Sequence, residues 1–376
     1  MPSLVKDLIT PAAVARLVLG WGAFAALLAL PAHSESLPGP VLAALLVGIV
    51  TVILVCAFGV VHEAEHLARR LGDPYGTLVL TLSIVLIEVV LIVAVLLGPG
   101  EHATIARDSV MAVSMIILNL IIGLCLLVGG LRHGGMRANR TGTSAYLAML
   151  VVFGSLAFAL PGLIGRDGAF TPAQAVPLAA LTLGLYAFFL WRQMGAQAND
   201  FREMDARVAD ADEPGHAPIG ETLREHRGEI LGRLVLLVAA VLPIVLLSHH
   251  LAELLDDTLA RLGAPAALSG VLIAAIVFLP ESITSVRAAL GGEIQRVSNL
   301  CHGALVSTVG LTVPAVLVIS LLTGQHAVFA ENATNLTLLA VTGLLSIATF
   351  SARRVNAMHG AAHLAVFAVY ALSLFA

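Results

Sequence analysis

Two glutamates stand within long apolar stretches of this chain of 376 residues. Glu88 lies at the centre of TLVLTLSIVLIEVVLIVAVLLG, where it is the only charged side chain, and Glu281 lies in ALSGVLIAAIVFLPESITSVRAAL. An ionised carboxylate inside a membrane span costs a few kcal/mol unless it faces water, a cation or a proton. The two acids are therefore the first candidates for ligands of a transported ion.

Oxygen-bearing side chains surround both glutamates. Thr81 precedes Glu88 by seven residues, which places the two on roughly the same helix face. Pro280 directly precedes Glu281 and would free a backbone carbonyl one turn earlier, while Ser282 and Ser285 follow. Ca²⁺ takes six to eight oxygen ligands, and two carboxylates neutralise its charge. This pattern predicts a Ca²⁺ site with Glu88 and Glu281 as ligands and Thr81, Ser282 and Ser285 lining it.

The same two acids can also couple the cation to protons. Burial and mutual repulsion disfavour two charged carboxylates side by side, so an empty site retains at least one proton. Cation and proton then compete for the same oxygens, which is sufficient for exchange. A lone buried acid tied to a neighbouring helix by a hydrogen bond is the structural alternative for each glutamate.

Two further apolar stretches carry polar and small residues at helical spacing. Amides and hydroxyls there are candidates to line the site, whereas the glycines are better explained by close helix packing. A lone histidine in such a stretch, His302, is expected to be packed and hydrogen-bonded. The candidate lining residues are Asn119, Asn299, Ser307 and Thr308, and the packing glycines are Gly123, Gly303 and Gly310.

A second motif indicates a different chemistry: His62, Glu63 and His66 match the HExxH pattern of zinc proteases. In that pattern the two histidines share a helix face and bind Zn²⁺, and the glutamate is the general base. The nearest acid that could be a further ligand is Asp73, and the pattern is short. We therefore favour a solvated turn at a helix end, anchored by Arg69 and Arg70, and keep an intramembrane zinc protease as a distant alternative.

The composition requires a membrane protein, because 59% of the residues are hydrophobic, only 12% are charged and the mean hydropathy is +0.96. A span needs about 20 apolar residues, and eleven stretches qualify. We therefore predict an all-α polytopic fold. The predicted spans are 12–31, 40–61, 77–98, 109–131, 143–165, 174–191, 230–248, 266–290, 297–323, 333–351 and 359–375.

Basic residues alternate between the connecting loops, which predicts a cytoplasmic N-terminus and an outer C-terminus. The outer loops would hold Arg107, Arg166 and Arg261. The inner segments would hold Lys6, Arg69, Arg70, Arg132, Arg137, Arg140, Arg192, Arg202, Arg207, Arg224, Arg227, Arg287, Arg296, Arg353 and Arg354.

The predicted organisation is one extra helix followed by two five-helix repeats of opposite orientation, since an odd helix number per half inverts the second half. The N-terminal helix covers 1–36, the first repeat 37–191 and the second repeat 230–376. A charged cytoplasmic linker, 192–229, separates them and is expected to be solvated, with a regulatory cation site there as the minority interpretation.

Several other classes of function are not indicated. Cys56, Cys125 and Cys301 lie in apolar spans without CxxC spacing, as buried small residues do. Scattered arginines form no basic patch, so no nucleic-acid partner is expected. No cofactor is expected either: Ca²⁺ and H⁺ are transported ions, and membrane lipid is the remaining partner.

Three long stretches resemble the ChaA-type calcium/proton antiporters of the cation/calcium exchanger superfamily. They are GDPYGTLVLTLSIVLIEVVLIVAVLL, RDSVMAVSMIILNLIIGLCLLVGGLR and PESITSVRAALGGEIQRVSNLCHGALVSTVGLTVPAV, and the similarity covers about residues 40–376. The resemblance implies two inverted five-helix halves with alternating access, and Glu88 and Glu281 as cation ligands. Ala304 replaces a serine that is frequent in relatives, and the linker lacks a histidine-rich or purely acidic tract.

The sequence therefore predicts a bacterial inner-membrane antiporter, not an enzyme, that exports Ca²⁺ against protons. The main alternative is a Na⁺/H⁺ or K⁺/H⁺ antiporter, because a single carboxylate suffices for a monovalent ion. Selectivity among these cations depends on cavity size and ligand number, which spacing does not give.

Overall fold

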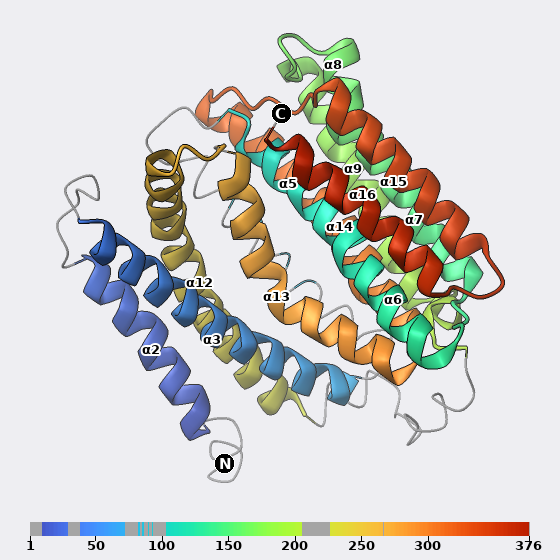
Figure 1. Ribbon diagram of the computed structural model, residues 1–376, viewed down its shortest axis with the longest axis horizontal. Helices are drawn as coiled ribbons and strands as arrows, with labels where there is room; N and C mark the ends of the chain where they lie inside the picture. The colour runs from blue at the N-terminus through green and yellow to red at the C-terminus, as the bar shows by residue number, and fades with distance from the viewer. Residues whose placement is uncertain are drawn as a thin grey trace. The chain divides into compact units, whose positions relative to one another are not determined.

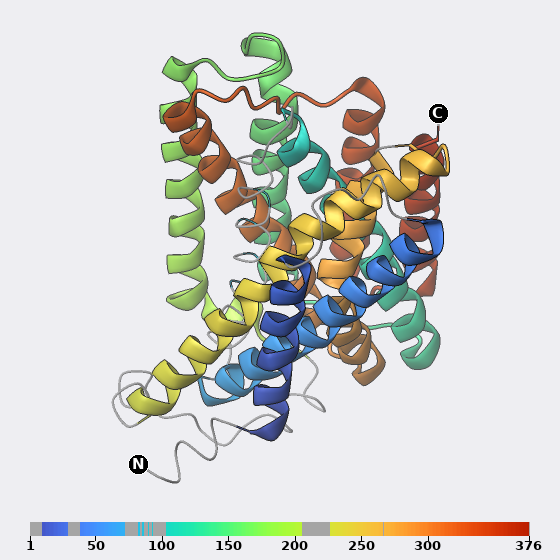
Figure 2. The same ribbon diagram turned by 90° about the vertical axis from the view of Figure 1, so that its left-hand side faces the viewer.

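The computed structural model of the protein is helical over most of the residues that it describes (Figure 1 and Figure 2). It describes residues 10–28, 38–71, 82, 85, 89, 92, 103–204, 226–265 and 267–375. Over these ranges there is no strand, and extended backbone pairs only at the isolated bridges Met136–Val355 and Arg166–Ala169. In the same ranges eight helices are long and apolar enough to cross a membrane, or nine with one bent helix. The chain is an all-α polytopic membrane protein.

The chain divides into two compact units, and each unit draws on both halves of the sequence. Unit 1 contains the described parts of Met1–Leu91 and Pro214–Pro280, and unit 2 those of Ile92–Glu213 and Glu281–Ala376.

Unit 1 is built from α2 (Pro11–Leu28), α3 (Gly39–Leu71), α12 (Arg227–Arg261) and the first part of α13 (Ala267–Gly291). In Figure 1, α2, α3 and α12 lie side by side. Gly20 of α2 permits this packing, because a Cβ at that position would be 3.0 Å from Cys56 Sγ of α3 and 3.0 Å from Pro243 Cβ of α12.

Helix α12 is longer than the predicted span 230–248. Its 35 residues correspond to about 52 Å, against about 30 Å for the hydrocarbon core. The apolar run ends before His250, but the helix continues because Leu251, Leu255 and Leu259 are buried and keep an apolar stripe at helical spacing.

Unit 2 holds the second part of α13 and most of the other helices. One membrane span is composed of three segments, in which a π-helical turn, η2, interrupts the α-helix. The elements are α5 (Ile105–Met115), η2 (Ile116–Ile121), α6 (Ile122–His133), α7 (Arg140–Gly154), η3 (Ser155–Ala159), α8 (Leu160–Ile164), α9 (Pro172–Met194), η4 (Ala198–Phe201), α14 (Ile294–Thr323), α15 (Ala333–Ser351) and α16 (Ala357–Ser373).

The core of unit 2 is α14, which is buried along most of its length. Gly303 faces the ring of Tyr146 on α7, and a Cβ there would be 3.2 Å from the tyrosine Oη. Gly310 faces the ring of Tyr186 on α9, where a Cβ would be 2.9 Å from Cγ. These glycines therefore serve close helix packing, as their spacing predicts.

The connections of unit 2 gather at its two ends. At one end the backbone N–H of Met136 donates to Val355 O (2.9 Å), and His133 Nε2 lies 3.0 Å from Leu290 O. At the other end Val328 N–H donates to Ala103 O (2.7 Å). The loop after α14 thus meets the start of α5, so these two helices run antiparallel.

The predicted spans agree with the described helices to within a few residues, except where α3 and α12 continue beyond their apolar cores. The predicted span 77–98 lies outside the described residues, apart from helical positions 82, 85, 89 and 92. Helix α16 is apolar but has only 17 residues. The count of eleven spans is therefore not confirmed.

Candidate cation-binding site

Glu88 and Thr81 lie outside the described residues, so their places in the predicted site remain predictions. Glu281 is described and is buried, with 4% of its surface exposed. It begins the second segment of α13: Leu268–Ile276 and Glu281–Gly291 are bent by 60°. The bend falls where Pro280 predicts a break.

Hydroxyl groups accompany Glu281 along the second segment of α13. Ser285, one turn on, is fully buried, and Thr284 is 9% exposed. Cys301 of α14 donates its thiol to Ser285 Oγ over 3.7 Å. Ser282 is half-buried. The segment therefore brings one carboxylate and several hydroxyl oxygens to the buried side of unit 2, which are ligand types that hard cations prefer.

Asn119 lies in the π-helical turn η2 and is fully buried. Its Nδ2 donates to Thr342 Oγ1 (2.9 Å), and its Oδ1 lies 3.3 Å from His363 Nδ1. The Nε2 of this histidine is 3.2 Å from Thr349 Oγ1. Single π-helical turns are frequent at functional sites. The arrangement makes a polar cluster inside unit 2 that joins η2, α15 and α16.

Sequence reasoning missed three members of this cluster: Thr342, Thr349 and His363. A signal was present, since Thr342, Ser346 and Thr349 recur at helical spacing in an apolar helix and all three are fully buried. No sequence pattern connects that stripe to Asn119.

The predicted lining residues of α14 lie at different heights. Asn299 donates from Nδ2 to Phe201 O (2.6 Å) and accepts at Oδ1 from Gln295 Nε2 (2.9 Å). Ser307 accepts from Tyr186 Oη (2.9 Å) and donates to a backbone carbonyl. Eight residues of helix separate the two, or about 12 Å. Thr308, next to Ser307, is fully buried.

His302 is packed and hydrogen-bonded, as predicted. Its Nδ1 lies 2.9 Å from Ser298 Oγ, which in turn is 3.3 Å from Thr143 Oγ1 of α7. The ring stacks on Tyr146 and meets Phe350 edge-on.

The HExxH residues lie within α3, so the expectation of a solvated turn is wrong. Glu63 is 7% exposed, and its Oε2 accepts from Arg233 Nη1 of α12 over 2.8 Å. Arg233 also reaches Glu229 Oε1 (3.2 Å). The rings of His62 and His66 contact each other at 4.6 Å between centroids. No group of three metal-binding side chains occurs among the residues that the structure describes.

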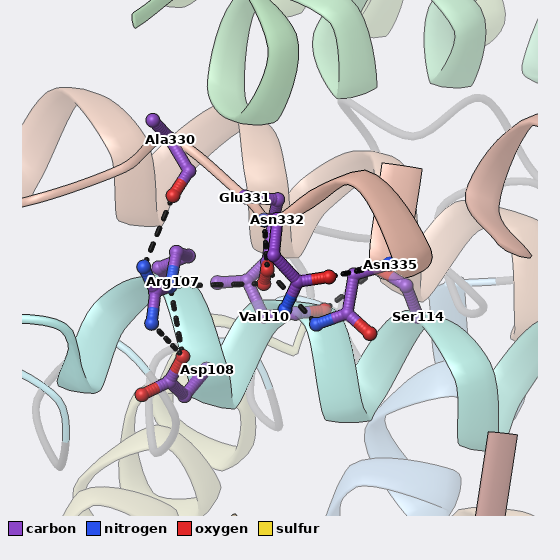
Figure 3. Close-up of polar contacts among 8 residues, drawn as sticks. All are labelled: Arg107, Asp108, Val110, Ser114, Ala330, Glu331, Asn332 and Asn335. Carbon is purple, nitrogen blue, oxygen red and sulfur yellow. Dashed lines mark hydrogen bonds and ion pairs between the residues drawn. The ribbon is translucent and has the colours of Figure 1, made fainter. Parts of the chain in front are cut away.

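A second polar cluster, which sequence reasoning also missed, connects the start of α5 to the loop before α15 (Figure 3). Arg107 donates to Asp108 Oδ1 (2.8 Å) and Ala330 O (3.0 Å), and its Nε lies 3.8 Å from Glu331 Oε1. Glu331 Oε2 accepts from Asn335 Nδ2 (2.9 Å). Burial raises the pKa of Glu331, while the hydrogen bond from Asn335 and the charge of Arg107 oppose the rise.

Buried polar groups inside many apolar spans are typical of an ion transporter. The sodium/calcium exchanger protein family matches residues 41–195 and 233–376 of the chain. The chain therefore belongs to this family, within the cation/calcium exchanger superfamily of antiporters. It is an exchanger and not an enzyme, which removes the zinc-protease alternative.

Individual relatives agree with this assignment. The sodium-potassium/proton antiporter ChaA of Escherichia coli K12 is 32% identical over 324 residues, covering 86% of this chain and 87% of that protein. The solved structure of native YfkE matches with a TM-score of 0.69 at 17% identity, over 97% of this chain and 98% of the other. The H⁺/Ca²⁺ exchanger CAX also matches with a TM-score of 0.69, at 16% identity over 96% and 87%. These two structural likenesses concern the fold.

Proposed function

We propose that the protein exchanges cytoplasmic Ca²⁺ for protons at a site that contains Glu88 and Glu281. The observation that supports this most is the burial of Glu281 at the bend of α13 in a member of an exchanger family. A carboxylate in that place needs a positive charge or a proton to offset desolvation. Ca²⁺ and H⁺ would satisfy it alternately.

The coupling follows from the charge of the site. With Ca²⁺ bound, both carboxylates are ionised and the divalent charge is neutralised. With Ca²⁺ absent, protons replace it, because an empty doubly ionised pair is too costly to carry across the membrane. The site changes its access from one side of the membrane to the other only when Ca²⁺ or protons neutralise its carboxylates. Each cycle therefore exchanges Ca²⁺ for protons.

Monovalent exchange is the second candidate, and a specific observation favours it. The relative from Escherichia coli is named as a sodium-potassium/proton antiporter and is 32% identical, whereas the CAX structure is titled as that of an H⁺/Ca²⁺ exchanger. A single carboxylate neutralises Na⁺ or K⁺. Dependence on both glutamates therefore favours Ca²⁺, and dependence on one favours a monovalent ion.

The decisive experiment measures proton movement in proteoliposomes with an imposed pH gradient and a panel of Ca²⁺, Na⁺ and K⁺. We expect Ca²⁺ to drive proton movement, and Glu88→Gln and Glu281→Gln each to abolish it in correctly folded protein. Glu253→Gln, on a side chain of α12 that is 55% exposed, is the matched control and should retain exchange. Retained Ca²⁺ exchange in both site variants would overturn the proposal.

The inverted repeat is part of this proposal, and two capping asparagines support it. Asn139 caps α7 and its backbone N–H donates to Gln295 Oε1 near the start of α14 (2.8 Å). Asn332 caps α15, and its neighbour Ala330 accepts from Arg107 near the start of α5. Since α5 and α14 run antiparallel, a contact between a helix-capping segment and the start of a membrane-spanning helix occurs at each end of unit 2.

Orientation and membrane are proposed from the charge pattern. The end of unit 2 that joins Met136 to Val355 carries arginine-rich connections, such as the one with Arg353 and Arg354. By the positive-inside rule this end faces the cytoplasm. The C-terminus, at the far end of α16, is then outside, and the alternation of basic residues between loops places the N-terminus inside. The membrane is proposed to be the bacterial inner membrane.

A further inference from the structure

Residues 198–204, here called the strap, begin the charged linker but are packed against unit 2. The strap contains the 3₁₀ turn η4, and Phe201 in it is 4% exposed. Its ring lies 5.1 Å from Tyr146 of α7 and 6.0 Å from Phe189 of α9, between centroids. Gly142 gives the strap room, because a Cβ there would be 2.1 Å from Asp200 O. The strap therefore occupies a fitted position between α7 and α9.

The strap is also bonded to the start of α14. Glu203 Oε2 accepts from the backbone N–H groups of Gln295 (2.9 Å) and Arg296 (3.3 Å). These N–H groups belong to the first turn, which has no acceptors within its own helix. Asn299, one turn further, donates to Phe201 O. Three hydrogen bonds thus fasten the strap to the helix that carries Ser307 and Thr308.

Glu203 is placed to respond to protons. Burial raises its pKa to about 7, although the backbone hydrogen bonds from Arg296, Gln295 and Met204 oppose the rise, and the charge of Glu293 adds to it. The Arg296 guanidinium donates to Glu293 Oε2 (2.9 Å). The helices on either side of the strap contribute Arg140 at the start of α7 and Arg192 of α9, which is bound to Gln197.

The direction of the effect follows from linkage. A carboxyl that holds its proton more tightly when docked favours docking at low pH and loses that contribution as the pH rises through the docked pKa. Between pH 7 and the ordinary value of 4.5, the docking constant should rise about tenfold for each unit by which the pH falls. Above pH 7 docking is at its weakest.

We propose that Glu203 is a regulatory proton-binding site, at which protonation fastens the strap to α14 and thereby slows exchange. The direction of this control rests on the proposed function, in which protons move inward, and on the proposed orientation, in which the strap faces the cytoplasm. Protons that accumulate inside would then restrain the helix that lines the transport site. In this way the exchanger would limit the acidification of the cytoplasm that its own activity causes.

The test follows the strap itself and does not depend on transport. A nitroxide label on Met204→Cys, where the side chain is 57% exposed, reports strap mobility in the full-length protein in liposomes. The native cysteines are buried and react slowly. We expect the immobilised fraction to grow as the pH falls from 8 to 5. Glu203→Gln, a mimic of the protonated form, should remain immobilised at every pH, and Phe201→Ala should remain mobile.

Asp167→Asn removes a carboxyl from the loop between α8 and α9 at the opposite end of unit 2 and should leave the pH dependence unchanged. A spectrum of the labelled Met204→Cys chain that does not change with pH would overturn the proposal, as would an unchanged transition when Glu203→Gln is added to that chain. A transport arm completes the test: at strap-side pH 6 relative to pH 8, exchange should slow in the native protein and not in Phe201→Ala. Absence of all exchange would refute the proposed function while leaving the mobility result intact.

Discussion

The buried ion pair between Glu63 and Arg233 gives a stability prediction with unequal effects of its two partners. Their side chains are 9% and 10% exposed, and Arg233 has a second partner in Glu229. Arg233→Met removes the guanidinium that neutralises the buried Glu63, and also one partner of the half-buried Glu229, and should cost about 3–5 kcal/mol. Glu63→Gln leaves Arg233 with Glu229 and with an amide oxygen to bond, so it should cost about 1–3 kcal/mol.

Trp21 provides the probe for this measurement. It belongs to unit 1, where its Nε1 donates to Ala239 O of α12 (3.1 Å), and Trp191→Phe leaves it as the single tryptophan of the chain. Unfolding in detergent, followed by its fluorescence, gives the double-mutant cycle. The double variant should recover at least about 1 kcal/mol relative to the sum of the single variants.

The control for this cycle is Asp257→Asn, which breaks an exposed pair with Arg261 on one helix and should cost less than about 1 kcal/mol. Additive effects of Glu63→Gln and Arg233→Met would refute the reasoning. A larger loss for Glu63→Gln than for Arg233→Met would refute it as well.

Two further predictions concern unit 2. Because burial raises the pKa of Glu331, ionisation of this carboxyl destabilises the fold as the pH rises through its pKa in the folded protein. The melting temperature of the native chain should therefore fall relative to that of Glu331→Gln between pH 5 and pH 8. A difference in melting temperature that stays constant over this range would contradict the prediction. Gly130→Ala would place a Cβ 2.2 Å from Ala357 N, so α6 and α16 must separate at a cost of about 1–3 kcal/mol. Gly184→Ala on α9, with nothing within 4 Å, should be neutral or stabilising by up to about 1 kcal/mol, and equal thermal shifts for the two glycine variants would be inconsistent with the packing described.

The membrane spans could be predicted from sequence because hydropathy over about 20 residues is a local property. Their ends were less accessible, as α12 shows. Beyond His250 the helix depends on the burial of Leu251 and Leu255, and burial depends on neighbours that hydropathy does not identify. The π-helical turn at Asn119 was also not predictable, because no local residue pattern marks it. The Asn119 side chain is bonded to Thr342 and His363, which come from helices distant in sequence.

Glu63 and Asn299 illustrate how pairing changes an interpretation. In sequence, Glu63 follows an apolar run and precedes charged residues, which is the pattern of a solvated helix end. The structure buries it because Arg233, 170 residues away, neutralises it. Asn299, which is predicted to line the transport site, has its amide groups bonded to Phe201 and Gln295, and its place in that site stays a prediction. Arg233 and Phe201 are distant in sequence from the residues they contact, and spacing does not encode such pairing.

The two ends of unit 2 each hold an acid beside the start of a membrane-spanning helix, buried at Glu331 and half-buried at Glu203, but their surroundings differ. Glu331 has Arg107 as a counter-charge, which opposes protonation. Glu203 accepts hydrogen bonds from two uncharged backbone N–H groups of α14, and the charge of Glu293 adds to the rise of its pKa. Desolvation that raises the pKa of Glu203 to about 7 leaves this carboxyl sensitive to protons in the neutral range. Ionisation of Glu331 therefore has a nearby guanidinium to offset it, whereas ionisation of Glu203 is offset by backbone hydrogen bonds, and we expect the contact at Glu203 to respond more strongly to pH.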